Sequence, residues 1–183
     1  IETGEDLLEP DAMSVGMSGT THLSILDCQG NAISMTHTLG TASGVVTPGL
    51  GFLYNNDMGA FDPVPNHINS IIPGKSPVNG GAPTILLRDG QVVMVIGSPA
   101  GGRKLTAELQ AILNVVEFGM GMQEAVSVER IHSEKKKRVI YVEPNFTLFL
   151  KAGLEELGNI VEFDPYTARL SAIYLNPETG KLE

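Results

Sequence analysis

The chain has 183 residues, a formal net charge of −9, and 18% charged against 42% hydrophobic residues. This composition is globular rather than disordered, and the length suffices for one domain with a sizeable core. The acidic balance argues against a nucleic-acid-binding protein, because the neutralisation of phosphates requires a basic face. The dense basic stretch Lys135–Arg138 is interpreted as a solvated loop or a strand lead-in.

A lone cysteine, Cys28, excludes an internal disulfide and any multi-cysteine zinc site. No apolar run approaches the roughly 20 residues that span a bilayer. The first ten residues, IETGEDLLEP, contain no methionine, no basic region and no long apolar core, which is not typical of a signal peptide. We therefore expect the chain to be a piece of something longer, and its beginning does not indicate a localisation.

The first half of the chain is expected to consist of a tail, a hairpin and a long loop. Residues 1–19 are rich in Gly, Pro, Ser and acids and are interpreted as a linker or tail. The runs HLSIL and AISMTHTL flank the turn residues DCQGN and predict a β-hairpin. Residues 41–67 are rich in Gly, Pro and Asn and predict long irregular structure, which is often functional.

The second half predicts a hairpin followed by alternating helices and strands. PTILLRDGQVVMVIG places Asp89-Gly90, a favoured two-residue turn, between two aliphatic runs, and residues 92–96 predict a strand covered on both faces. Apolar residues at helical spacing then predict a helix that Gly119 or Gly121 ends: Leu105, Leu109, Ile112, Leu113 and Val116. Helices over 122–128 and 146–157 and strands in RVIYVEP, NIVEF and ARLSAIYLN complete an α+β domain, with helices packed on an antiparallel sheet.

The Thr20-Thr21 pair has a structural and a catalytic interpretation. A threonine hydroxyl often completes the hydrogen bonds of a strand end. As a nucleophile it needs a base, and the adjacent His22 is poorly placed for Thr21, because neighbours in a strand point to opposite faces. Cleavage after the unhindered Gly19 would instead give Thr20 a free α-amino group, whose pKa of about 7.7–8.0 suits a base near neutral pH.

The stretch GSPAGG, residues 97–102, could supply an oxyanion hole. It joins a buried strand to a helix, where backbone N–H groups are exposed and directed at anions. The alternative is an ordinary strand-to-helix turn. The stretch lacks the G-x-G-x-x-G spacing of a dinucleotide fingerprint, and PGKS is not a phosphate loop, because residue 69 is an asparagine rather than the required glycine.

Three separated motifs resemble the γ-glutamyltranspeptidase family, and the resemblance runs from about Ser18 to the end of the chain. SGVVTPGLGFLYNNDM and GSPAGGR follow a nucleophile-type segment in the order that the family shows. That first segment, TTHLSILDCQGNAISMTHTLG, matches the family pattern at Thr20, Thr21, His22, Ser24, Gly30, Asn31, Thr36 and Thr38.

The resemblance implies an N-terminal-nucleophile hydrolase with an αββα sandwich, whose precursor cuts itself into a large and a small subunit that stay associated. Residues 1–19 would then lie on the large-subunit side of the processing site, and residues 20–183 would be the small-subunit catalytic region without its C-terminal tail. Thr20 would be the nucleophile and the new N-terminus of the small subunit, and Thr38 would hold its hydroxyl or help during autoprocessing. The N–H groups of Ala100, which stands where the family usually has glycine, and of Gly101 would form the oxyanion hole.

Three departures from the family pattern fall on the residues that read the glutamate of the donor. The family's asparagine after T-x-T-L is Gly40, its acidic pair after N-N-x-M is Gly59-Ala60, and its Ser-Ser pair is Asn79-Gly80. Asp57 and Asp62 are nearby acids that could compensate, since a buried ammonium without a carboxylate is costly. The pattern favours a γ-glutamyltranspeptidase-like acylase with another acyl group, of the cephalosporin-acylase kind.

The sequence thus indicates a self-processing amidohydrolase or acyltransferase acting on a γ-glutamyl or related N-acyl amide, with the large subunit of the same precursor as its partner. The alternative is an unprocessed, non-catalytic relative that serves as a binding or scaffold module. No metal or cofactor is expected, because His37, His67 and His132 have no metal-type spacing and are interpreted as structural or surface residues.

Overall fold

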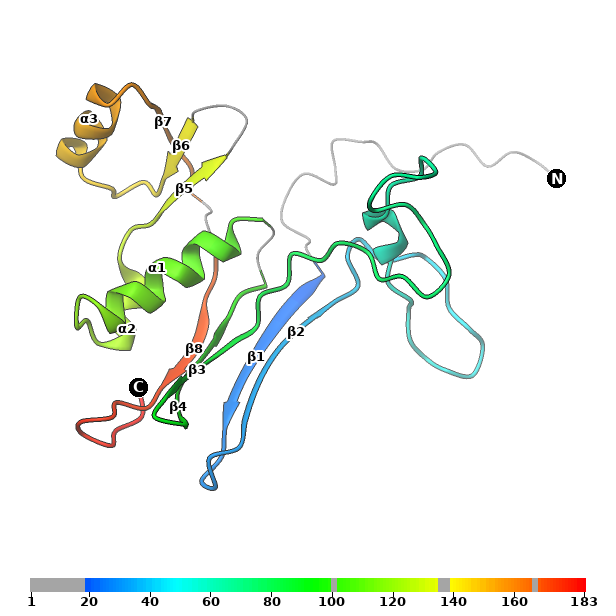
Figure 1. The fold of residues 1–183 in the computed structure, drawn as a ribbon, viewed down its shortest axis with the longest axis horizontal. Helices are drawn as coiled ribbons and strands as arrows, with labels where there is room; N and C mark the ends of the chain where they lie inside the picture. Colours follow the sequence, from blue (N-terminus) through cyan, green and yellow to red (C-terminus); the bar gives the residue numbers. More distant parts are fainter. Residues whose placement is uncertain (1–18, 100–101, 135–138, 166–167) are drawn as a thin grey trace. The chain divides into compact units, whose positions relative to one another are not determined.

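The structure is a computed structural model, and it describes residues 19–99, 102–134, 139–165 and 168–183 (Figure 1). The described residues form a mixed α and β structure. Its elements are β1 (Thr20–Leu26), β2 (Ala32–Thr38), the 3₁₀ turn η2 (Asp57–Ala60), β3 (Thr84–Arg88), β4 (Gln91–Gly97), α1 (Lys104–Val116), α2 (Met122–Ser127), β5 (Ile131–Glu134), β6 (Val139–Val142), α3 (Leu148–Glu156), β7 (Ile160–Phe163) and β8 (Ser171–Tyr174).

The chain divides into two compact units, and the division falls at the open ends of the β1–β2 hairpin. Of the described residues, one unit comprises 19–20 and 38–78, and the other comprises 21–37 and those from 79 onward. In the first unit the described residues are mostly irregular, as the composition of residues 41–67 predicted. Their regular features are η2 and two isolated bridges, Val46–Leu53 and Asp62–Ser70.

The core of the second unit lies between the sheet β3–β4–β8 and two helices. Both strand pairs of this sheet are antiparallel, and β4 is its central strand. Asp89 and Gly90 join β3 to β4 with φ of 52° and 79°, as the predicted tight turn requires. Helices α1 and α2 pack on the sheet through a buried cluster that confirms burial of β4: Met94, Ile96, Ala111, Val115, Met122 and Ala125.

A second three-stranded sheet, β5–β6–β7, contains a parallel strand pair, which the sequence did not predict. β5 and β6 are antiparallel, but β6 and β7 are parallel. The expected antiparallel pairing is therefore observed for β3–β4, β4–β8 and β5–β6 but was wrong for β6–β7. Helix α3 lies between the two strands in the chain and returns it to the end from which β6 began, which is how parallel neighbours are connected.

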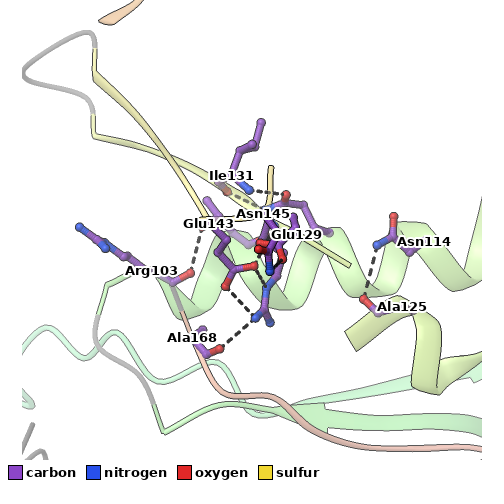
Figure 2. Close-up of polar contacts among 11 residues, drawn as sticks. Arg103, Asn114, Ala125, Glu129, Ile131, Glu143, Asn145 and Ala168 are labelled. Carbon is purple, nitrogen blue, oxygen red and sulfur yellow. Dashed lines mark hydrogen bonds and ion pairs between the residues drawn. The ribbon is translucent and has the colours of Figure 1, made fainter. Parts of the chain in front are cut away.

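Buried polar side chains connect the β5–β6 hairpin to helix α1. Glu143 accepts hydrogen bonds from the backbone N–H and the guanidinium of Arg130, both at 2.9 Å, and the same guanidinium donates to the carbonyl of Ala168 at 3.2 Å (Figure 2). On α1, the Gln110 side chain accepts from the N–H of Ile131 at 3.0 Å and donates to its carbonyl at 2.8 Å. These contacts satisfy polar groups that would be costly to bury alone.

The predicted helix over α1 is confirmed, but most of its larger apolar residues face outward. Its buried positions are Lys104, Ala107, Glu108, Ala111 and Val115. Leu105, Leu109, Leu113 and Val116 are exposed. The helix therefore presents an apolar stripe on its outer face, which the sheet β3–β4–β8 does not cover.

None of the described helices is long and apolar enough to cross a membrane. Within the same described ranges, no cluster of three His, Cys, Asp or Glu side chains is arranged to hold a metal ion.

Candidate active site

Thr20 and Thr38 come together because one begins β1 and the other ends β2. The hairpin brings their side chains side by side, with 2.7 Å between the two Oγ1 atoms. Thr38 Oγ1 also accepts a hydrogen bond from the backbone N–H of Gly40 at 2.8 Å. Thr38 therefore has a fixed position beside the hydroxyl that the resemblance names as the nucleophile, and the catalytic roles of the two residues stay predictions.

The peptide bond before Thr20 lies in the same cluster. The carbonyl oxygen of Gly19 accepts a hydrogen bond from the N–H of Leu39 at 3.4 Å. A side chain at position 19 would be crowded, because an added Cβ would lie 3.3 Å from the carbonyl oxygen of Gly40. Glycine at this position therefore fits against Gly40 without displacing it.

Gly40 is a structural requirement, and the residue that makes it one is Asn56, which the sequence did not single out. Gly40 has φ of +62°, and an added Cβ would lie 2.0 Å from Asn56 Oδ1. That oxygen is held, because it accepts from the N–H of Thr41 at 3.0 Å while Asn56 Nδ2 donates to the Thr41 hydroxyl. The Asn56 amide thus occupies the space beside Gly40. The signal in the sequence was Gly40 itself, because a glycine in place of the family's asparagine leaves space that a neighbouring side chain can fill.

The other predicted binding residues have hydrogen-bond partners of their own. Asp57 is half-buried at the start of η2, where its N–H donates to Asn55 Oδ1 at 3.1 Å. Asp62 is paired with His67 Nδ1 at 2.5 Å, so it is engaged elsewhere. Asn79 belongs to the other unit, is exposed, and accepts from the N–H of Gly81 at 2.6 Å.

Gly80 also belongs to the second unit, and the predicted oxyanion donors lie outside the described residues. An added Cβ on Gly80 would lie 4.0 Å from Lys104 Cε at the start of α1. Ala100 and Gly101 fall in the gap between residues 99 and 102. The strand-to-helix connection that carries them is observed at both ends, since β4 ends at Gly97 and α1 begins at Lys104.

A second polar group on the β1–β2 hairpin was not anticipated. His22 is only 8% exposed, and its Nδ1 and Nε2 lie 2.8 Å and 3.2 Å from the hydroxyls of Thr36 and Ser24. Burial lowers the pKa of His22 below its ordinary value. The sequence motif contains these residues, but only the fold brings them into one network.

A profile described as gamma-glutamyltranspeptidase matches residues 8–183 of the chain. A glutathione hydrolase proenzyme from Pseudomonas sp. strain A14 is 43% identical over 129 residues, which cover 64% of this chain and 22% of the relative. An acylase ACY 1 proenzyme from Pseudomonas sp. strain SE83 is 33% identical over 181 residues, which cover 94% of this chain and 32% of the relative.

Solved structures give the same result for the fold. A mutant γ-glutamyltranspeptidase from Helicobacter pylori superposes with a TM-score of 0.79 at 32% identity, over 89% of this chain and 95% of that one. A cephalosporin acylase from Bacillus halodurans gives 0.78 at 26% identity, over 92% of this chain and 34% of that one. The predicted fold class, the α+β fold of N-terminal-nucleophile hydrolases, is confirmed by this likeness.

The chain spans about a fifth to a third of the length of the curated relatives that it matches. Within that span the match includes the threonine pair, the Asn56 region and the strand-to-helix connection before α1. The chain belongs to the gamma-glutamyltranspeptidase family.

Proposed function

We propose that the chain is the nucleophile-bearing part of a self-processing amidohydrolase and acyltransferase of the γ-glutamyltranspeptidase type. The observation that carries this proposal is the 2.7 Å contact between Thr20 Oγ1 and Thr38 Oγ1, directly after Gly19. A threonine hydroxyl is a weak nucleophile, so its orientation and its base decide whether it reacts. Relatives named as proenzymes support a precursor that must be cut before it acts.

In the proposed self-cleavage, Thr20 Oγ1 attacks the carbonyl carbon of Gly19. The N–H of Leu39, which donates to that carbonyl oxygen at 3.4 Å, is placed to stabilise the negative charge that develops there. The hydroxyl proton passes to the amide nitrogen, which leaves as the α-amino group of Thr20, and an ester joins Gly19 to Oγ1. Water then hydrolyses this ester and releases the Gly19 carboxylate.

In the proposed turnover, the new α-amino group serves as the base for its own hydroxyl. Its pKa of about 7.7–8.0 leaves part of it neutral near pH 7. Oγ1 attacks the amide carbon of the donor, the protonated amine returns its proton to the leaving amine, and an acyl-enzyme remains. The backbone N–H groups of Ala100 and Gly101 are the proposed oxyanion donors. Water or an acceptor amine then resolves the acyl-enzyme.

The proposed donor is an N-acyl amide whose acyl group is not read as a classical γ-glutamyl group. Gly40 and the Asn79-Gly80 pair offer no carboxylate or hydroxyl, and the space beside Gly40 is taken by Asn56. Asp57 and Asp62 are half-buried acids on either side of the lost acidic pair, and Asp62 is paired with His67. The likeness to an acylase over almost the whole chain agrees with this substrate class.

The proposed partner is the large subunit of the same precursor. The outer face of the β1–β2 hairpin exposes Leu23, Ile25, Ile33 and Met35. A contiguous apolar sheet face is costly in water and is typical of an interface. The second sheet of an αββα sandwich would cover it.

The test is intact-mass and N-terminal analysis of the full-length precursor. We expect a single cut between Gly19 and Thr20, no cut in Thr20→Ala, and a retained cut in Thr20→Ser, because serine keeps the hydroxyl. A folded wild-type precursor that stays uncut under all conditions would instead support the non-catalytic binding module.

A further inference from the structure

The imidazole of His22 is fixed by hydroxyl groups from both strands of the hairpin. Its Nδ1 lies 2.8 Å from Thr36 Oγ1. Its Nε2 lies 3.2 Å from Ser24 Oγ and 3.4 Å from Ser34 Oγ. Because residues two apart in a strand share a face, His22 lies on the same face of β1 as Thr20, and Thr36 lies on the same face of β2 as Thr38.

The two serines determine which ring nitrogen carries the proton. Ser24 Oγ lies 2.9 Å from the carbonyl oxygen of Ser171 in β8, and Ser34 Oγ lies 2.9 Å from that of Ile96 in β4. A carbonyl oxygen cannot donate, so each of these contacts uses the one proton of its serine. The serines therefore have only lone pairs to offer to the ring, and Nε2 must be the donor.

The other ring nitrogen then accepts from Thr36. In a neutral imidazole with Nε2–H, Nδ1 has a lone pair and receives the hydroxyl proton of Thr36. Burial lowers the pKa of His22, which agrees with a neutral ring, and none of its hydrogen-bonding partners Thr36, Ser24 and Ser34 carries a charge. Every polar atom of the ring has a partner in this arrangement.

The ring also lies directly against the last residue of β4. A Cβ added to Gly97 would lie 2.1 Å from the Cε1 atom of His22 and 2.5 Å from both ring nitrogens. No side chain fits at position 97 while His22 keeps its place. From Gly97 the chain continues toward α1.

We infer that His22 is a positioning residue which, as the neutral Nε2–H tautomer, locks the β1–β2 hairpin onto β4 and β8 and thereby fixes the strand that begins with Thr20. The serine-to-carbonyl bonds connect the hairpin to the three-stranded sheet, and the imidazole holds both serines in that orientation. The inference rests on the proposed function of Thr20. His22 itself does not touch the reacting atoms and acts through the strand.

The first experiment is ¹⁵N NMR of the full-length Thr20→Ala precursor labelled at histidine nitrogen. The chain has four histidines, and His22→Gln in the same background assigns the signal. We expect a pyrrole-type Nε2 and a pyridine-type Nδ1 at pH 7. An imidazolium signal or the Nδ1–H tautomer would overturn the inference. This measurement does not depend on self-cleavage or on catalysis, so it tests the inference even if the wild-type precursor does not cleave itself.

The second experiment compares the self-cleavage rates of full-length His22→Leu and His22→Gln precursors. Displacing a reacting group by about 1 Å can cost on the order of 100-fold, so we expect His22→Leu to slow cleavage at least about tenfold. The terminal NH₂ of glutamine can donate as Nε2–H does, so His22→Gln should regain part of the rate. Gly97→Ala should behave as His22→Leu, because it displaces the ring.

The matched control is His37→Gln, which changes an exposed histidine on the opposite face of β2. We expect it to cleave within about twofold of the wild type, as surface substitutions usually have small effects. Cleavage of His22→Leu at the wild-type rate would overturn the inference. If His22→Leu does not fold, the NMR signature and the glutamine variant still decide. A His22→Gln precursor that folds but cleaves as slowly as Gly97→Ala would contradict the donor role of Nε2–H.

Discussion

Gly40 and Asn56 show how one residue pair can fill the space beside Thr38 without disturbing the hydrogen bond that holds it. The backbone N–H of Gly40 supports Thr38, while the open side of Gly40 is filled by the amide of Asn56. A family-type asparagine at position 40 therefore cannot be restored by a single substitution. The packing of Asn56 against Gly40 leaves no space for an asparagine side chain at position 40.

We predict that Gly40→Asn lowers stability and does not create γ-glutamyl amide hydrolysis. Overpacking of this kind typically costs about 1–3 kcal/mol, and here the new Cβ meets a hydrogen-bonded oxygen at 2.0 Å. Thermal unfolding and a γ-glutamyl anilide assay of the full-length protein are the measurements.

Gly44→Asn is the matched control for this prediction. Gly44 has φ of +74° in the same unit, and an added Cβ would meet nothing within 4 Å. It therefore carries the same left-handed backbone cost without the contact with Asn56. Equal melting temperatures for the two variants would show that the contact does not matter.

At the scale of elements, helix α1 has an ionisable buried face and an apolar exposed one. Glu108 is 3% exposed, and its Oε1 has no hydrogen-bond partner among the described residues. Burial raises the pKa of Glu108 to about 7 from an ordinary 4.5, although the nearby Lys104 ammonium acts in the opposite direction. The helix therefore favours a protonated glutamic acid in its buried face.

We predict that Glu108→Gln removes a pH dependence of stability. Since the folded pKa lies above the unfolded one, the unfolded chain ionises first, and wild-type stability falls as pH rises from about 4.5 to about 7. A pKa unit is worth about 1.4 kcal/mol, so the loss is on the order of 3 kcal/mol. Denaturant unfolding of both full-length proteins at pH 5 and pH 8 should show a growing advantage for the glutamine variant.

The exposed Glu117, just past the end of α1, provides the control for this prediction. Glu117→Gln removes the same charge from a solvated position and should follow the wild-type pH profile. Parallel profiles for the wild type and Glu108→Gln would contradict the assignment of the pH dependence to Glu108.

Prediction of the elements succeeded where the signal is local and failed where it is not. The Asp89-Gly90 turn and the helical spacing of α1 gave elements close to the observed ones. Strand β5, IHSE, was missed because a single apolar residue among polar ones shows no clear period. The parallel β6–β7 pair was wrong because pairing direction depends on where α3 returns the chain.

At the scale of the whole molecule, the described residues of the second unit expose several apolar surfaces, and two of them bear on partner binding. One is the outer face of the β1–β2 hairpin, and the other is the outer stripe of α1. The chain matches only 22% and 32% of the length of two proenzyme relatives, and in the proposed precursor further chain of that kind would cover these surfaces. The large subunit is the occupant that we propose for the hairpin face.

We predict that Leu23→Glu together with Ile33→Glu abolishes copurification of the two processed subunits. Both side chains are exposed on the hairpin, and a charge buried in an apolar interface without a partner is strongly unfavourable. Affinity purification through a tag on the large subunit measures the effect. Gln29→Glu, in the exposed turn of the same hairpin, should copurify normally, and unchanged copurification of the double variant would exclude this face as the interface.

The sequence by itself determined the family, the fold class and the most local features, because strand period, helical spacing and turn chemistry are properties of neighbouring residues. Tertiary structure alone decided that Asn56 fills the space beside Gly40 and that His22 lies on Gly97. It also decided that α1 buries Glu108 and exposes Leu109. These features are contacts between residues far apart in the chain or consequences of what a face packs against, and no window of sequence contains both partners.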